Sequence, residues 1–100
     1  METKISKEND DTTLKVIGRL DTTNAGEFEI VIQQFIKDKE LSLIVDLSEL
    51  TYISSSGLRC FILLLKSMTA NNNSLVLENL RPEIKEVFDM TGFTKLFNIK

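Results

Sequence analysis

The sequence predicts an α/β fold, a mixed, mostly parallel sheet of four to five strands with helices packed on it. Short apolar runs rich in β-branched residues alternate with longer segments in which apolar residues recur every three or four positions. These are the periods of strands and helices, and their alternation is typical of parallel strands joined by helices. Because 100 residues suffice for one core, we expect a single domain spanning residues 1–100.

Two strands are predicted near the N-terminus. Lys4–Lys7 is a candidate short edge strand, followed by a charged turn. From Thr12 to Leu20, apolar residues alternate with polar ones, which indicates a half-buried strand. Lys15 and Arg19 fall on its polar side and are expected to face solvent.

A helix is predicted to follow, from about Asn24 to Lys39, because apolar residues form one stripe along it. Thr23 or Asn24 is expected to cap its N-terminus, with Glu27 at the capping-box position. Lys37 and Lys39 fall in its last turn, where positive charge suits the negative end of a helix.

The rest of the chain alternates in the same way. The predicted elements are a buried strand at Leu43–Val45, a short Leu50–Ile53 segment entering a serine-rich turn, a helix from Gly57 to about Ala70, a strand at Ser74–Glu78, a helix from Pro82 to about Thr91, and a last short strand at Phe97–Ile99. Pro82 fits the first position of a helix, and Gly92 fits its stop. The core is expected to hold the phenylalanines Phe28, Phe35, Phe61, Phe88, Phe93 and Phe97.

Composition argues against several functions. Lys and Arg number 12 against 15 Asp and Glu, a net charge of -3, whereas nucleic-acid binding needs a basic face. The longest apolar stretch, Leu58–Leu65, is interrupted by Arg59 and is too short to span a bilayer. Met1–Asp11 lacks the apolar segment of a signal peptide. We therefore expect a cytoplasmic protein with no nucleic-acid partner and no direct membrane insertion.

The chain has one cysteine and no histidine. An internal disulfide is thus excluded, as are Ser-His-Asp and Cys-His nucleophiles and all histidine-containing metal sites. Cys60 lies in an apolar run and is expected to be buried, a reactive thiol being the minor alternative. Without a metal-ligand cluster or a glycine-rich phosphate loop, the sequence favours a non-enzymatic protein with no metal and no cofactor.

The candidate functional segment is the serine-rich turn within Leu43–Met68. Ser54, Ser55 and Ser56 stand at the start of a predicted helix, where unpaired N–H groups and the helix dipole favour an anion or a covalent phosphate. Serines in this place are usually caps and nothing more, and Ser54 and Ser56 are expected to have that role. Asp46, at the preceding strand end, is expected to hydrogen-bond to the turn.

Three motifs together resemble STAS domains, the family of the anti-sigma factor antagonists. Gly18–Asp21, G-R-L-D, is similar to the family's G-E-L-D segment. Leu43–Arg59, with D-L-S and then S-S-S-G-L-R, resembles the central signature, in which D-S-S-G-L or D-S-T-G-L follows an aromatic turn. Pro82–Gly92 resembles the last motif, P-x-x-x-x-x-F-x-x-x-G. Their order and spacing both match from about Thr12 to the end of the chain.

The resemblance implies a partner-switching protein. It would bind an anti-sigma factor that is also a serine kinase, lose that binding when phosphorylated, and regain it through a serine phosphatase. Ser55 matches the phosphorylated position, with Ser54 and Ser56 as alternatives. The residues implied to contact the partner are Asp21, Thr22, Ser54, Ser56, Gly57, Leu58 and Arg59.

The chain departs from the family pattern at three places. Ser54 stands where the family usually has aspartate, and Arg19 stands where it usually has glutamate. The sequence also stops at Lys100, where relatives commonly continue into a strand and a helix. An open sheet edge there would support a homodimer.

A second function is compatible with these residues. The apolar Gly57–Met68 helix and the serine at position 54 also fit a constitutive STAS-like regulatory subunit of a membrane lipid-transport complex, which would not be phosphorylated.

Overall fold

The computed structural model describes residues 1–38 and 40–100. Along the chain the elements are β1 (Glu2–Glu8), β2 (Asp11–Leu20), α1 (Ala25–Ile36), β3 (Ser42–Asp46), β4 (Leu50–Ile53), α2 (Ser55–Ala70), β5 (Ser74–Glu78), α3 (Pro82–Thr91), the 3₁₀ turn η1 (Phe93–Lys95) and β6 (Asn98–Ile99). The strands form one sheet in the order β1-β2-β3-β5-β6, and β4 pairs with β2. β1 is antiparallel to β2, while the other pairs are parallel. The predicted mixed, mostly parallel sheet is confirmed.

The long strand β2 has two neighbours on one side, one after the other. Its first half pairs with β3 and its last residues pair with β4. The register shifts between Gly18 and Arg19, and Gly18 has φ 92°, a backbone conformation that glycine adopts without a steric penalty. This bulge brings β4 alongside the end of β2.

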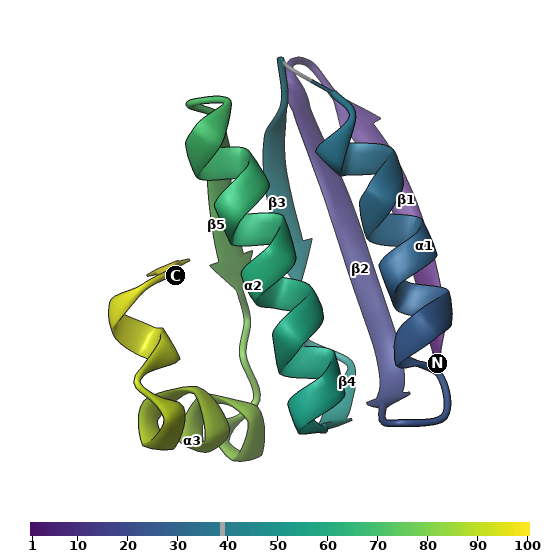
Figure 1. The fold of residues 1–100 in the computed structure, drawn as a ribbon, viewed down its shortest axis with the longest axis vertical. Coiled ribbons are helices and arrows are strands. Elements are labelled where there is room, and N and C mark those ends of the chain that lie inside the picture. The colour runs from purple at the N-terminus through teal and green to yellow at the C-terminus, as the bar shows by residue number, and fades with distance from the viewer. Residues whose placement is uncertain (39) are drawn as a thin grey trace.

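The helices α1 and α2 lie side by side across one face of the sheet (Figure 1). Alternate strand residues, among them Leu14, Val16, Leu43 and Val45, point into this layer and are fully buried. Phe61 of α2 is central to the aromatic packing, with its ring centroid 5.5 Å from that of Phe28, 6.0 Å from Phe88 and 6.5 Å from Phe97. Five of the expected core phenylalanines are buried, and Phe93 packs partly buried against them.

Some predicted boundaries were wrong. β1 is longer than Lys4–Lys7, and the segment read as leading into a turn is the strand β4. With β4 and the two-residue β6, the sheet has six strands over the described residues. The long helix also begins at Ser55 rather than Gly57. Pairing with β2 decides the β4 assignment, and a four-residue segment carries too little periodicity to show it.

The predicted cap of α1 was right in position and wrong in its hydrogen bond. Asn24 is the N-cap residue, but its side chain makes no cap hydrogen bond to any described residue. It instead accepts from the backbone N–H of Asp21 and donates to the carbonyl of Arg19. Lys37 lies just beyond the last helical residue, and the prediction for Lys39 falls outside the described residues.

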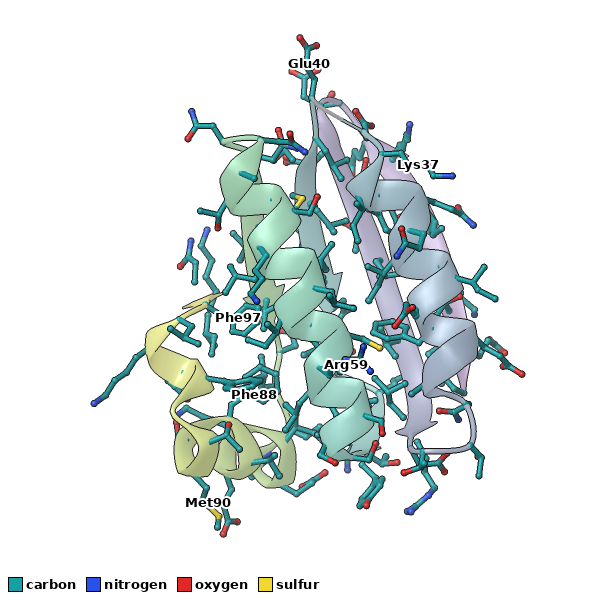
Figure 2. The ribbon with its side chains drawn as sticks, in the orientation of Figure 1. Lys37, Glu40, Arg59, Phe88, Met90 and Phe97 are labelled. Carbon is teal, nitrogen blue, oxygen red and sulfur yellow. The ribbon has the colours of Figure 1, made fainter. Side chains whose placement is uncertain are left out.

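The C-terminal segment follows the sequence prediction closely. Pro82 opens α3, and Gly92 ends it in the left-handed conformation with φ 80°. Figure 2 shows Phe88 and Phe97 pointing from this segment toward α2. Among the helices that the structure describes, none has the length and apolar character needed to cross a membrane.

Replacing Phe61 should strongly destabilise the fold. Phe61→Ala removes a fully buried ring with three aromatic neighbours, so we expect the free energy of unfolding to fall by about 3–5 kcal/mol. Urea denaturation followed by circular dichroism measures the change. Met90→Ala is the control, because Met90 is 80% exposed and should cost within about 0.5 kcal/mol.

Candidate functional site

The serine-rich turn lies where two neighbouring parallel strands end. Leu20 of β2 is paired with Ile53 of β4, and the backbone N–H of Ser54 donates to the carbonyl of Leu20 at 2.9 Å. The thiol of Cys60, in α2, contacts the carbonyl of Ala25 at the start of α1, with 3.6 Å between sulfur and oxygen. The loop after β2 and the turn after β4 are therefore held at the same edge of the sheet.

Ser54 is the N-cap of α2. Its backbone is extended (φ -90°, ψ 172°), and its Oγ accepts from the backbone N–H of Gly57 at 3.2 Å. Its carbonyl accepts from the N–H of Leu58 at 2.9 Å. Of the two candidate caps, Ser54 and Ser56, the structure confirms Ser54. Ser56 is half-buried, and no cap hydrogen bond from it occurs among the described residues.

Ser55 is the first residue of α2, and its side chain is exposed. Within the described part of the chain, no group accepts a hydrogen bond from the backbone N–H of Ser55 or Ser56. These donors and the helix dipole make the position favourable for an anion. Arg59 lies one turn further along α2, and its exposed side chain is labelled in Figure 2. Residues four apart share a helix face, so Arg59 adds positive charge on the side of Ser55.

Gly57 lets the first turn of α2 press against the two strand ends. A Cβ atom there would lie 2.8 Å from Cγ of Leu20 and 3.0 Å from Cγ1 of Ile53. Both of these side chains are buried, so neither has room to move away. The close packing that the sequence suggested for Gly57 is confirmed, and it fixes the position of the serines.

The loop after β2 carries an ionised carboxylate beside this turn. Oδ1 of Asp21 accepts from the hydroxyl of Thr23 at 2.6 Å and from its backbone N–H at 3.0 Å. The Thr23 hydroxyl is the main cause that lowers the pKa of Asp21 below its usual value. Thr22, between them, is exposed.

Comparison with known proteins places the chain in a family. A family model described as the STAS domain matches residues 2–100. The chain belongs to the STAS domain family. BtrV of Bordetella bronchiseptica, a candidate anti-sigma factor antagonist, is 34% identical to this STAS domain over 82 residues, 82% of this chain and 71% of BtrV. The anti-sigma-B factor antagonist of Listeria monocytogenes is 27% identical over 94 residues, 94% of this chain and 82% of that protein.

Solved structures share the fold of this STAS domain. A candidate anti-sigma factor antagonist from Thermotoga maritima matches with a TM-score of 0.87 at 20% identity, over 97% of this chain and 84% of that chain. Unphosphorylated SpoIIAA and phosphorylated SpoIIAA of Bacillus match with TM-scores of 0.79 and 0.73, both at 16% identity. Each covers 99% of this chain, and the matches span 88% and 91% of the SpoIIAA chains. The predicted STAS-like fold is confirmed.

Two residues at this edge were not predicted to act together. Arg19 was assigned to a solvent-exposed strand face, and Tyr52 was read as part of a turn. In the structure they are paired across β2 and β4, and the guanidinium carbon lies 4.2 Å from the centroid of the tyrosine ring. A cation over an aromatic face is an attractive contact. The sequence carries no local signal for it, because it depends on the bulge at Gly18.

The remaining predicted site residues differ in their exposure to solvent. Gly57 and Leu58 are buried, so they support the turn of the STAS domain from within, whereas Arg59 is exposed. Asp46 accepts from the backbone N–H of Ser48 at 3.0 Å, which confirms its expected role at the strand end. Cys60 is buried, and burial raises the pKa of its thiol, which favours the unreactive form. Across the described residues, no cluster of His, Cys, Asp and Glu could hold a metal ion.

Adding one methyl group at Gly57 should destabilise the STAS domain. Gly57→Ala forces a carbon into contact with Leu20 and Ile53, and such overpacking costs about 1–3 kcal/mol. Gly26→Ala in α1 is the matched control, because a Cβ there meets no atom of the described residues within 4 Å. It should leave stability unchanged or raise it by up to about 1 kcal/mol. Equal urea midpoints for both variants would contradict the close packing at Gly57.

Substitution of Ser54 tests the cap. Ser54→Ala removes the acceptor for the Gly57 N–H, and loss of an N-cap costs about 1 kcal/mol of unfolding free energy. Ser54→Asp keeps an acceptor and adds a charge that suits the helix N-terminus, so it should match or exceed the wild type. Thermal and urea unfolding of the three proteins measure the order, and an alanine variant as stable as the wild type would show that the cap contributes nothing.

Proposed function

We propose that this STAS domain is a non-enzymatic, cytoplasmic anti-sigma factor antagonist controlled by phosphorylation of Ser55. With Ser55 unmodified, it binds an anti-sigma factor that is also a serine kinase. Phosphorylation of Ser55 releases that partner, and a serine phosphatase restores binding. Residues 1–100 act as a single domain in this role.

The exposure of Ser55 is the observation that carries the proposal. Three serines stand in the turn, but the hydroxyl of Ser54 is occupied as the helix cap, and Ser56 is half-buried. Ser55 is exposed at the first position of α2. Its hydroxyl is therefore the most accessible to a kinase, and relatives that are anti-sigma factor antagonists support the partner class.

A phosphate at Ser55 suits the protein itself. It adds about -1.5 to -2 charges at pH 7, next to unpaired backbone N–H groups and the positive end of α2. Gly57 packs this turn tightly onto β2 and β4, so the fold should change little. SpoIIAA, which shares the fold, has been solved in both the unphosphorylated and the phosphorylated form.

The same phosphate opposes binding of a partner. A partner surface that fits against unmodified Ser55 would have to bury a dianion once Ser55 is phosphorylated. That surface would have no group to neutralise the added charge. Burying an uncompensated charge costs several kcal/mol. Release would therefore be electrostatic and steric, without refolding of the domain.

The proposed partner surface surrounds Ser55. Asp21 and Thr22 flank it from the loop after β2, Ser54 and Ser56 adjoin it, and Arg59 extends it along α2. Gly57 and Leu58 contribute by holding the turn in place. The serine at position 54 supplies a cap without a negative charge, so kinase recognition depends on other residues of this surface.

Phosphorylation should occur at Ser55 alone. Incubation with the cognate anti-sigma factor kinase and ATP is expected to add one phosphate, which fragmentation of the tryptic peptide Glu40–Arg59 assigns to Ser55. Ser55→Ala should abolish incorporation, while Ser54→Ala and Ser56→Ala should retain it. Phosphate on either neighbour, or none in this peptide, would overturn the assignment.

A negative charge at Ser55 should end partner binding. Ser55→Asp is expected to weaken affinity for the anti-sigma factor kinase by at least tenfold. The circular dichroism should stay unchanged, because only the surface charge differs. Ser74→Asp is the matched control, since Ser74 is exposed at the opposite, N-terminal end of β5. Equal affinity of Ser55→Asp and wild type would favour the constitutive subunit of a lipid-transport complex instead.

A further inference from the structure

Arg19 and Tyr52 form a fixed pair beside the proposed switch. They are register partners on β2 and β4, and the guanidinium of Arg19 lies 4.2 Å from the ring centroid of Tyr52. Tyr52 is 41% exposed, and the Arg19 side chain is 62% exposed. A tyrosine side chain combines an apolar ring with a polar hydroxyl, which suits it to a protein interface.

The hydrogen-bond donors of Arg19 are not used within the described part of the chain. Its nearest carboxylate oxygen, Oδ2 of Asp21, lies 4.0 Å from Nε, which is beyond hydrogen-bond distance. The other carboxylate oxygen of Asp21 is occupied by Thr23. The guanidinium is thus oriented by the ring and a nearby charge, with its N–H groups available to an external acceptor.

The pair is continuous with the turn that carries Ser55. Tyr52 is followed by Ile53 and then by Ser54. Ile53 packs inward against Gly57, whereas Tyr52 is exposed. The carbonyl of Leu20, next to Arg19, accepts from the N–H of Ser54. A protein that covers Ser55 would therefore reach this pair without leaving the same edge of the sheet.

We propose that the Arg19–Tyr52 pair is an anchor for the anti-sigma factor kinase and that the kinase places a carboxylate against the Arg19 guanidinium. This inference rests on the proposed function. A planar guanidinium binds a carboxylate through two parallel hydrogen bonds. Stacking on Tyr52 fixes its plane in advance, so less side-chain entropy is lost on binding. Tyrosine and arginine are also among the residues that most often dominate interface energies.

Arg19 thus selects a partner that is acidic at this point, because its guanidinium is always charged and finds no hydrogen-bond acceptor within the described part of the chain.

Affinity measurements with the purified kinase and unphosphorylated variants test the anchor. Arg19→Ala and Tyr52→Ala should each weaken binding about tenfold or more, and Arg19→Glu should weaken it further. Arg19→Lys should recover only part of the affinity, because lysine keeps the charge but not the planar fork. Tyr52→Phe should bind like the wild type. Lys37→Ala is the control for loss of one exposed cation. Lys37 follows the C-terminal end of α1, at the opposite end of the molecule from the C-terminal end of β2 (Figures 1 and 2).

Tyrosine fluorescence provides a readout that does not involve the partner. Tyr52 is the single tyrosine and the chain has no tryptophan, so the emission of the free protein reports on this ring alone. Arg19→Ala should change that emission while the circular dichroism stays the same, and Lys37→Ala should not. Unchanged emission would overturn the stacked pair.

The outcomes separate the two proposals. If the unmodified wild type binds the kinase and the Arg19 and Tyr52 variants bind equally well, the anchor is wrong and the proposed function stands. If affinity falls equally for Arg19→Ala and Lys37→Ala, the effect is one of total charge and the anchor is again wrong. If the unmodified wild type does not bind the kinase, the proposed function fails and the anchor fails with it.

Discussion

The contact between the first turn of α2 and the ends of β2 and β4 determines the rest of the site. A backbone hydrogen bond joins Ser54 to Leu20, and the absence of a side chain at Gly57 lets the helix approach the strands. The capping bond from Gly57 to Ser54 closes the turn from the other side. With these contacts in place Ser55 has no freedom to withdraw into the fold, so any modification of its hydroxyl acts at the surface.

This rigidity suits a switch that works by charge. A helix N-terminus stabilises an added phosphate through its dipole and its unpaired N–H groups, so the unbound STAS domain would tolerate both states. A docked partner would not, because it must desolvate the same group. The difference between the two environments, rather than a change of shape, would set the direction of the switch. Arg19 and Tyr52 would add a charge-selective contact with the partner on the neighbouring strands β2 and β4.

Much of the fold was predictable, because its helices and strands follow from patterns of residues that are close together in the sequence. Apolar periodicity located α1, α2 and α3, and Pro82 and Gly92 marked the ends of α3 correctly. The order of strands and helices then implied a mostly parallel sheet. One error came where a side chain had two partners available: Asn24 was expected to cap α1, but it hydrogen-bonds to Asp21 and Arg19. Both roles fit the same sequence, and only the path of the loop decides between them.

The sequence by itself determined the serine turn and its helix and limited the cap to Ser54 or Ser56, because capping and helix formation depend on residues that are neighbours in the chain. The structure selected Ser54. Only the tertiary structure decided that β4 is a strand beside β2 and that Arg19 stacks on Tyr52. It also decided that Ser55, of the three serines, is the exposed one. These features depend on the register between segments far apart in the sequence, which the bulge at Gly18 sets and which no local pattern encodes.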